Sequence, residues 1–193
     1  MWKQFAIVLL VMAVTVPTAN AQLGPFGTQV WSQDSPGIPV GLEAGAEVGV
    51  ALASGDFNCD GIEDLAIGMP GEDLVQGDDA GRVLVMFGTV VGLSTVDSQV
   101  WGQNSPVVLG TAEEGDGFGT VLAAGDFDND GCSDLVVGSP EDTINGNPAA
   151  GSVNVIYGSV DGLSGDQDQL LHQDVGDLEG STEWFDRFGA ALA

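Results

Sequence analysis

Basic side chains are almost absent from this sequence. Its 193 residues include 3 lysines and arginines against 29 aspartates and glutamates, which gives a formal net charge of −26 at pH 7. Such a surface repels phosphate backbones and anionic membranes, and it attracts divalent cations. We therefore exclude nucleic acid as a partner and expect cation binding, with solubility or a salty habitat as a contributing cause of the acidity.

Histidine and cysteine are also scarce. The single histidine, His172, does not belong to a recognisable serine–histidine–acid triad. The sequence therefore does not support hydrolysis, and we expect no enzyme. The two cysteines are Cys59 and Cys132. They stand at different positions of two similar Asp-rich loops, residues 56–64 and 126–134. Since a disulfide needs Cα atoms within about 7 Å, and loops of neighbouring repeats should lie further apart, we expect free thiols. An exported protein would still allow a bridge.

Only one long apolar run is present, and it lies at the start of the chain. Lys3 is followed by an apolar stretch from Phe5 to Val16 and by a small-x-small site at Ala19-Asn20-Ala21. A membrane-spanning helix needs about 20 apolar residues, so we expect no membrane span. The sequence predicts a signal peptide over residues 1–21, cleavage after Ala21, and a secreted, cell-surface or periplasmic protein.

The rest of the chain repeats itself with a period of 70 residues and no insertion. Gln29-Val30-Trp31 recurs as Gln99-Val100-Trp101, and Gly55-Asp56-Phe57 recurs as Gly125-Asp126-Phe127. The same offset relates further pairs: Asp64-Leu65 and Asp134-Leu135, Gly81 and Gly151, Gly88 and Gly158, Gly92-Leu93-Ser94 and Gly162-Leu163-Ser164. A third copy begins and reaches Phe188-Gly189. Such self-similarity is typical of repeat architectures.

Each repeat predicts four short strands. In the first repeat they are residues 48–53, 64–68, 82–87 and 99–101, each bounded by Gly, Asp, Asn or Pro, and no segment has a sustained helical period. Four strands with glycine-rich turns indicate an all-β fold of four-stranded antiparallel β-propeller blades. Residues 28–33 would supply only a fourth strand.

The phase of the repeats predicts about two full blades. We place them at residues 48–102 and 118–172, with 188–193 starting a third, all within a single unit over residues 22–193. Because propellers close with about 4–8 blades, we expect an incomplete propeller: a fragment or truncated product, or else a subunit that closes by assembly. Further blades in a full-length chain would then be its nearest partners.

The most specific motif follows the first strand of each repeat, in the pattern D-x-[DN]-x-D-G-x-x-D. Oxygen ligands at positions 1, 3 and 5, a glycine at 6, a backbone carbonyl at 7 and a carboxylate at 9 suit Ca²⁺. We therefore predict two calcium sites. The first uses Asp56, Asn58, Asp60, Ile62 (carbonyl) and Asp64, and the second uses Asp126, Asp128, Asp130, Cys132 (carbonyl) and Asp134.

Two other interpretations of these loops compete with calcium binding. An EF-hand would need glutamate at position 12, where Ile67 and Val137 stand. A metal-free acidic turn is the simpler alternative, since Asp, Asn and Gly favour turns, but two such loops at a fixed offset favour calcium. Affinity rises with ligand charge, so we expect the second site, which has four carboxylates against three, to bind more tightly.

These features resemble the FG-GAP repeats of integrin alpha-subunit propellers and of many bacterial surface proteins. The "FG" is Phe118-Gly119 and Phe188-Gly189, with Val48-Gly49 in the first repeat, and the "GAP" is Gly68-Met69-Pro70 and Gly138-Ser139-Pro140. The resemblance implies a seven-bladed propeller in the complete protein. It also implies calcium at the loops on one face and partner-binding loops on the other.

Three functions follow as hypotheses. The first is a secreted calcium-binding module for adhesion to an extracellular protein or glycan. The second is a non-catalytic accessory propeller of a larger secreted hydrolase, because some relatives join such repeats to a phospholipase domain. The third is a structural envelope or matrix protein. The acid pairs Glu72-Asp73 and Glu141-Asp142 we interpret as solvated turns and not as catalytic carboxylates.

Overall fold

The structure is a computed structural model that describes residues 29–41, 43–175, 178 and 180–192. The predicted signal peptide, residues 1–21, lies outside the described residues. Within them the secondary structure consists of strands, turns and bends, and no helix is present. It follows that no helix in this part of the chain is long and apolar enough to cross a membrane.

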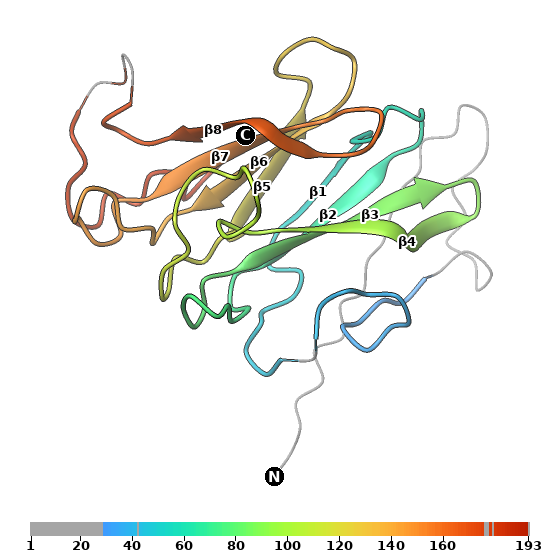
Figure 1. Cartoon of the computed structure of the whole chain (residues 1–193), viewed down its shortest axis with the longest axis horizontal. Helices are drawn as coiled ribbons and strands as arrows, with labels where there is room; N and C mark the ends of the chain where they lie inside the picture. The colour runs from blue at the N-terminus through green and yellow to red at the C-terminus, as the bar shows by residue number, and fades with distance from the viewer. Residues whose placement is uncertain (1–28, 42, 176–177, 179, 193) are drawn as a thin grey trace.

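Two four-stranded antiparallel sheets lie side by side (Figure 1). In each sheet the strands follow one another in chain order, as in a propeller blade. The first sheet contains β1 (Leu52–Gly55), β2 (Asp64–Met69), β3 (Arg82–Thr89) and β4 (Gly92–Trp101). The second contains β5 (Val121–Gly125), β6 (Asp134–Ser139), β7 (Ser152–Tyr157) and β8 (Ser164–Leu171).

The central strands are apolar because both of their faces are covered. β2 and β6 are buried along their whole length, and β3 is buried from Val83 to Gly88. Strands covered on both faces show continuous apolar runs and no alternation, as Val83-Leu-Val-Met-Phe87 does. The predicted all-β blades are therefore confirmed.

The two sheets share one register as well as one order. Leu65 pairs with Met86 in the first sheet, and Leu135 pairs with Ile156 in the second, at an offset of 70 from Leu65 and Met86. The irregularity between Val85 and Phe87 also recurs, between Val155 and Tyr157. The repeat thus fixes backbone details down to the position of a bulge.

The main core lies between the two sheets. Phe57, Val83 and Val85 of the first repeat pack against Leu135 and Ile156 of the second, together with other buried apolar residues. A second cluster covers the far face of the first sheet, where Val40 and Trp31 pack on β2 and β3. The first repeat is therefore enclosed on both sides.

The far face of the second sheet is an open apolar groove. It is lined by Ala123, Phe127, Val136, Val153, Val155, Tyr157, Gln169, Leu171, Phe188 and Leu192. Within the described residues the two sheets do not close into a ring, so the fold is an incomplete propeller of two blades.

Several expected strand boundaries differ from the observed ones, and the largest difference within a sheet is that β4 begins at Gly92 and not at residue 99. The first strand begins at Leu52 and not at residue 48. The expected fourth strand at 28–33 contains only a single bridge at Trp31, and residues 188–192 contain no strand. A strand extends only where a neighbouring strand runs beside it and shares its backbone hydrogen bonds, and no strand of the two described sheets pairs with either end segment.

Candidate calcium-binding site

Both predicted ligand loops lie at the same end of their sheets. The loop of residues 56–63 joins β1 to β2, and the loop of residues 126–133 joins β5 to β6. Their backbones turn through the same two left-handed positions, with φ of 57° at Cys59 and 63° at Asn129, then 84° at Gly61 and 98° at Gly131. Glycine at position 6 permits this turn at no steric cost.

In the first loop the acidic side chains are held by backbone amides. Asp60 N–H donates to Asp56 Oδ1 at 2.9 Å and to Asn58 Oδ1 at 3.1 Å. Gly61 N–H donates to Asp56 Oδ2 at 2.8 Å, and Ile62 N–H donates to Asp60 Oδ1 at 2.8 Å. Positions 1, 3 and 5 are thereby oriented within one turn of chain.

The second loop reproduces these bonds. Asp130 N–H donates to Asp126 Oδ1 at 3.2 Å and to Asp128 Oδ1 at 3.1 Å. Gly131 N–H donates to Asp126 Oδ2, and Cys132 N–H donates to Asp130 Oδ1. One carboxylate oxygen each of Asp126, Asp128 and Asp130 lies within 4.8 Å of the others. Three exposed carboxylates at such spacing repel one another unless a cation lies among them.

The position-9 carboxylates are placed differently from the other three. Asp64 is fully buried, and it accepts Phe57 N–H at Oδ2 and Gly88 N–H at Oδ1, both at 2.8 Å. Asp134 is equally buried and accepts Phe127 N–H at 2.7 Å and Gly158 N–H at 2.9 Å. Each of these carboxylates ties its loop to the end of the third strand.

Burial also changes the acidity of these two groups. Burial raises the pKa of Asp64 to about 6, against the lowering effect of its two amide donors. The pKa of Asp134 is raised for the same reason. A neighbouring cation would favour the charged form of both.

The chemistry of the donor set fits calcium. Each loop offers only oxygen donors at positions 1, 3 and 5, and each carboxylate oxygen that accepts one amide keeps a second lone pair for a metal. The ligand residues predicted from the sequence stay a prediction. The structure brings Asp126, Asp128 and Asp130 together, whereas Asp134 lies outside that group.

The expectation of free thiols is wrong. Cys59 and Cys132 form a disulfide, and their Cα atoms are 5.0 Å apart. Loops of neighbouring blades were expected to lie too far apart for a bridge, but the inner strands β1 and β5 contact each other directly and bring the two loops together. The same contact bonds the backbones, since Ser133 N–H donates to Asp56 O at 2.9 Å.

A glutamine clamp between the repeats was not predicted from the sequence. Gln99 Nε2 donates to Leu163 O at 3.1 Å, and Leu163 N–H donates to Gln99 Oε1 at 3.0 Å. Gln29 forms the same two bonds with Leu93. The recurrence of Gln-Val-Trp at an offset of 70 is the sequence signal that could have revealed this clamp.

The interpretation of two acid pairs as solvated turns was also wrong for one member of each. Glu72 and Asp142 are only 4% exposed, and they accept hydrogen bonds from Gln33 and Gln103. Both residues lie where the chain leaves β2 or β6. Each is covered by the segment that contains its glutamine partner, Gln33 or Gln103. They lie at the opposite end of the sheets from the candidate calcium loops.

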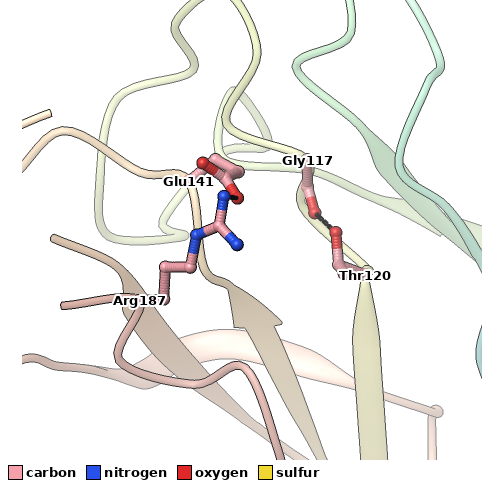
Figure 2. Close-up of polar contacts among 4 residues, drawn as sticks. All are labelled: Gly117, Thr120, Glu141 and Arg187. Carbon is pink, nitrogen blue, oxygen red and sulfur yellow. Dashed lines mark hydrogen bonds and ion pairs between the residues drawn. The ribbon is translucent and has the colours of Figure 1, made fainter. Parts of the chain in front are cut away.

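The neighbouring Glu141 remains at the surface and pairs with a base from the third repeat. Arg187 Nη2 lies 2.9 Å from Glu141 Oε1, and both side chains are about half exposed (Figure 2). The equivalent of Arg187 one repeat earlier is Gly117, whose carbonyl accepts Thr120 Oγ1–H at 2.6 Å (Figure 2). Ion pairs this exposed contribute little stability, so we assign this one no functional role.

Comparison with known proteins agrees with this architecture. A family model described as FG-GAP repeat matches residues 48–86 and 118–156. Phosphatidylinositol-glycan-specific phospholipase D of Rattus norvegicus is 38% identical over 117 residues, which are 61% of this chain and 14% of that protein. Integrin alpha-3 of Cricetulus griseus is 30% identical over 140 residues, which are 72% of this chain and 12% of that protein.

The chain therefore spans a small part of the length of each relative. The matched residues coincide with the first three strands of each sheet and include both ligand loops. This chain thus contains two FG-GAP repeats and is similar in sequence to integrin alpha subunits.

Proposed function

We propose that this protein is an extracellular calcium-binding propeller module that holds a protein or glycan partner and has no catalytic role of its own. The observation that carries the proposal is the recurrence of one amide-to-carboxylate bonding pattern in two oxygen-lined loops. Its support from the comparisons is the likeness to integrin alpha subunits. The predicted signal peptide supports export.

Calcium would act here as a structural ion. Each loop connects the first two strands of its sheet, so a bound ion would fix the hairpin and neutralise carboxylates that otherwise repel one another. Binding to the folded state alone stabilises that state by mass action. We expect two ions per chain.

Partner binding is proposed for the opposite end of the sheets. The segments 70–81 and 140–151 lie there, and Val75 is fully exposed at its tip. Exposed loops on a rigid scaffold are the usual place for recognition. An acidic molecule of this kind would prefer a partner surface that carries basic groups.

Isothermal titration calorimetry tests the calcium sites. We expect two binding events for the protein purified in chelator, one in Asp60→Ala, one in Asp130→Ala and none in the double variant. Absence of heat in the unmodified protein at millimolar calcium would refute the proposal. Binding to an array of extracellular proteins and glycans, compared with and without chelator, then tests the partner.

The likeness to phosphatidylinositol-glycan-specific phospholipase D favours one alternative. In that case the two blades belong to an accessory propeller of a larger secreted hydrolase. The full reading frame distinguishes the two, because the alternative requires a separate domain with catalytic residues. A structural envelope protein would instead form sheets or fibres without binding a partner.

A further inference from the structure

The two candidate calcium loops are joined covalently at positions that carry no ligating side chain. Cys59 is position 4 of the first loop, and Cys132 is position 7 of the second, where only the backbone carbonyl is a candidate ligand. The bridge spans 73 residues of sequence, although equivalent positions are 70 apart. It therefore links two different points of the loops, and neither residue has a cysteine equivalent in the other repeat.

The backbone around the bridge joins the ligand positions of both loops. Asp56, the first ligand position of loop one, donates its N–H to Ser133 Oγ at 3.2 Å and accepts Ser133 N–H at 2.9 Å. Ser133 stands between Cys132 and Asp134, which are positions 7 and 9 of loop two. A movement of either loop is thus transmitted to a ligand position of the other.

Without an ion these loops carry an internal repulsion. The carboxylates of Asp126, Asp128 and Asp130 are all exposed and lie within 4.8 Å of one another. Repulsion at this spacing favours an opened loop, and ordering an opened loop lowers the observed affinity for a ligand. A cross-link that limits the opening therefore raises calcium affinity.

We infer that the Cys59–Cys132 disulfide positions both calcium loops, so that its reduction lowers calcium affinity at each loop and bound calcium in turn opposes its reduction. This inference rests on the proposed calcium-binding function. The reduction itself is a two-electron step in which an external dithiol becomes a cyclic disulfide and the protein gains two thiols. Linkage requires the two effects to be reciprocal.

The decisive consequence crosses from one loop to the other. Cys59→Ser changes no candidate ligand atom, and yet it should lower the affinity of loop two. We expect about a tenfold loss, within the usual range of coupling between sites. Asp60→Ala isolates loop two, so calorimetry of Asp60→Ala with and without Cys59→Ser measures this loss directly. Cys132→Ser in Asp130→Ala makes the reciprocal measurement on loop one.

Gln99→Ala is the matched control, because it loosens the contact between the two blades without touching the bridge. It should leave both calcium affinities unchanged. Equal losses in Gln99→Ala and Cys59→Ser would overturn the inference, since the effect would then be general destabilisation. Unchanged affinity in Cys59→Ser would overturn it as well, while leaving the proposed function intact.

A second measurement needs no variant and so does not depend on the folding of one. The unmodified protein is equilibrated in dithiothreitol redox buffers with calcium or with chelator, and free thiols are counted by alkylation. Tenfold coupling at each loop predicts a combined hundredfold shift towards the disulfide, which is about 60 mV for a two-electron couple. Coincident curves from a protein that binds calcium would overturn the inference; absence of calcium binding would instead remove the proposed function.

Discussion

Gly68 approaches the carbonyl oxygen of Gly119 so closely that a Cβ atom on Gly68 would lie 2.1 Å from that oxygen. Gly138 meets Gly189 O in the same way in the next repeat, at 2.4 Å. The first glycine of each "GAP" thus touches the glycine of the following "FG", at the point where one blade passes to the next. This contact explains the glycine of the "GAP" signature, whereas a left-handed φ of 93° at Gly119 explains that of the "FG".

We expect Gly68→Ala to destabilise the protein by about 3 kcal/mol, the upper range for overpacking. The added methyl group would collide with backbone, which cannot move aside as a flexible side chain does. Urea unfolding measures the change. Gly41→Ala is the control, because no atom lies within 4 Å of the place that its Cβ would take, and it should stay within about 0.5 kcal/mol of the parent. Equal stability of the two variants would contradict the contact.

The glutamine clamp makes a second prediction. Gln99→Ala removes both hydrogen bonds to Leu163 and should cost about 1–2 kcal/mol of stability. Gln169→Ala is the natural comparison, since Gln169 stands one repeat later and bonds instead to the hydroxyl of Tyr157 in an exposed setting. Its loss should be much smaller. Denaturation midpoints that shift equally would argue against a specific clamp.

The charges of the two loops predict the order of calcium affinity. Position 3 is Asn58 in the first loop and Asp128 in the second, and this is the one difference among the side chains proposed as ligands. Asn58→Asp should therefore raise the affinity of loop one, and Asp128→Asn should lower that of loop two, each by about tenfold. Calorimetry at fixed ionic strength separates the two sites when the other loop carries an alanine at position 5.

A fourth prediction concerns pH. Asp116 is 1% exposed, and burial, together with the nearby carboxylates of Asp142 and Glu113, raises its pKa from 3.8 to about 7. The folded state then holds this proton more tightly than the unfolded chain does. Stability is therefore highest below the unfolded pKa and falls as pH rises through the window up to about 7.

The loss across that window should be on the order of 2 kcal/mol for Asp116. Asp116→Asn removes the titration and keeps an oxygen that can accept the N–H of Glu113, so its stability should depend less on pH. Urea unfolding in chelator at several pH values gives the slope for both proteins. Parallel slopes would show that Asp116 does not titrate in this way.

The sequence predicted the repeating architecture well because a 70-residue period without insertions forces equivalent backbones. β2 and β6, with their shared register, follow directly from Asp64-Leu65 and Asp134-Leu135. The shared turn of the two Asp-rich loops was predictable for the same reason, since side-chain oxygens at alternating positions fall within one local turn.

Contacts between repeats were the part that sequence periodicity does not describe. The bridge between Cys59 and Cys132 depends on how closely β1 approaches β5, which no pattern along the chain specifies. Burial of Glu72 and Asp142 has the same origin, because neighbouring segments cover them. Residues 29–33 and 188–192 do not form the expected strands, because no strand of the two described sheets pairs with them.

Phe57 and Phe127 occupy the same position of successive repeats, and yet the first is 0% and the second 58% exposed. The apolar groove around Phe127 favours association of the second blade with other apolar surfaces in water. The large negative charge of the chain opposes association between copies. Salt weakens that electrostatic repulsion over distances beyond about 8 Å at physiological strength, and it leaves apolar attraction in place. We therefore expect the two described blades to associate more readily at high ionic strength than in dilute buffer.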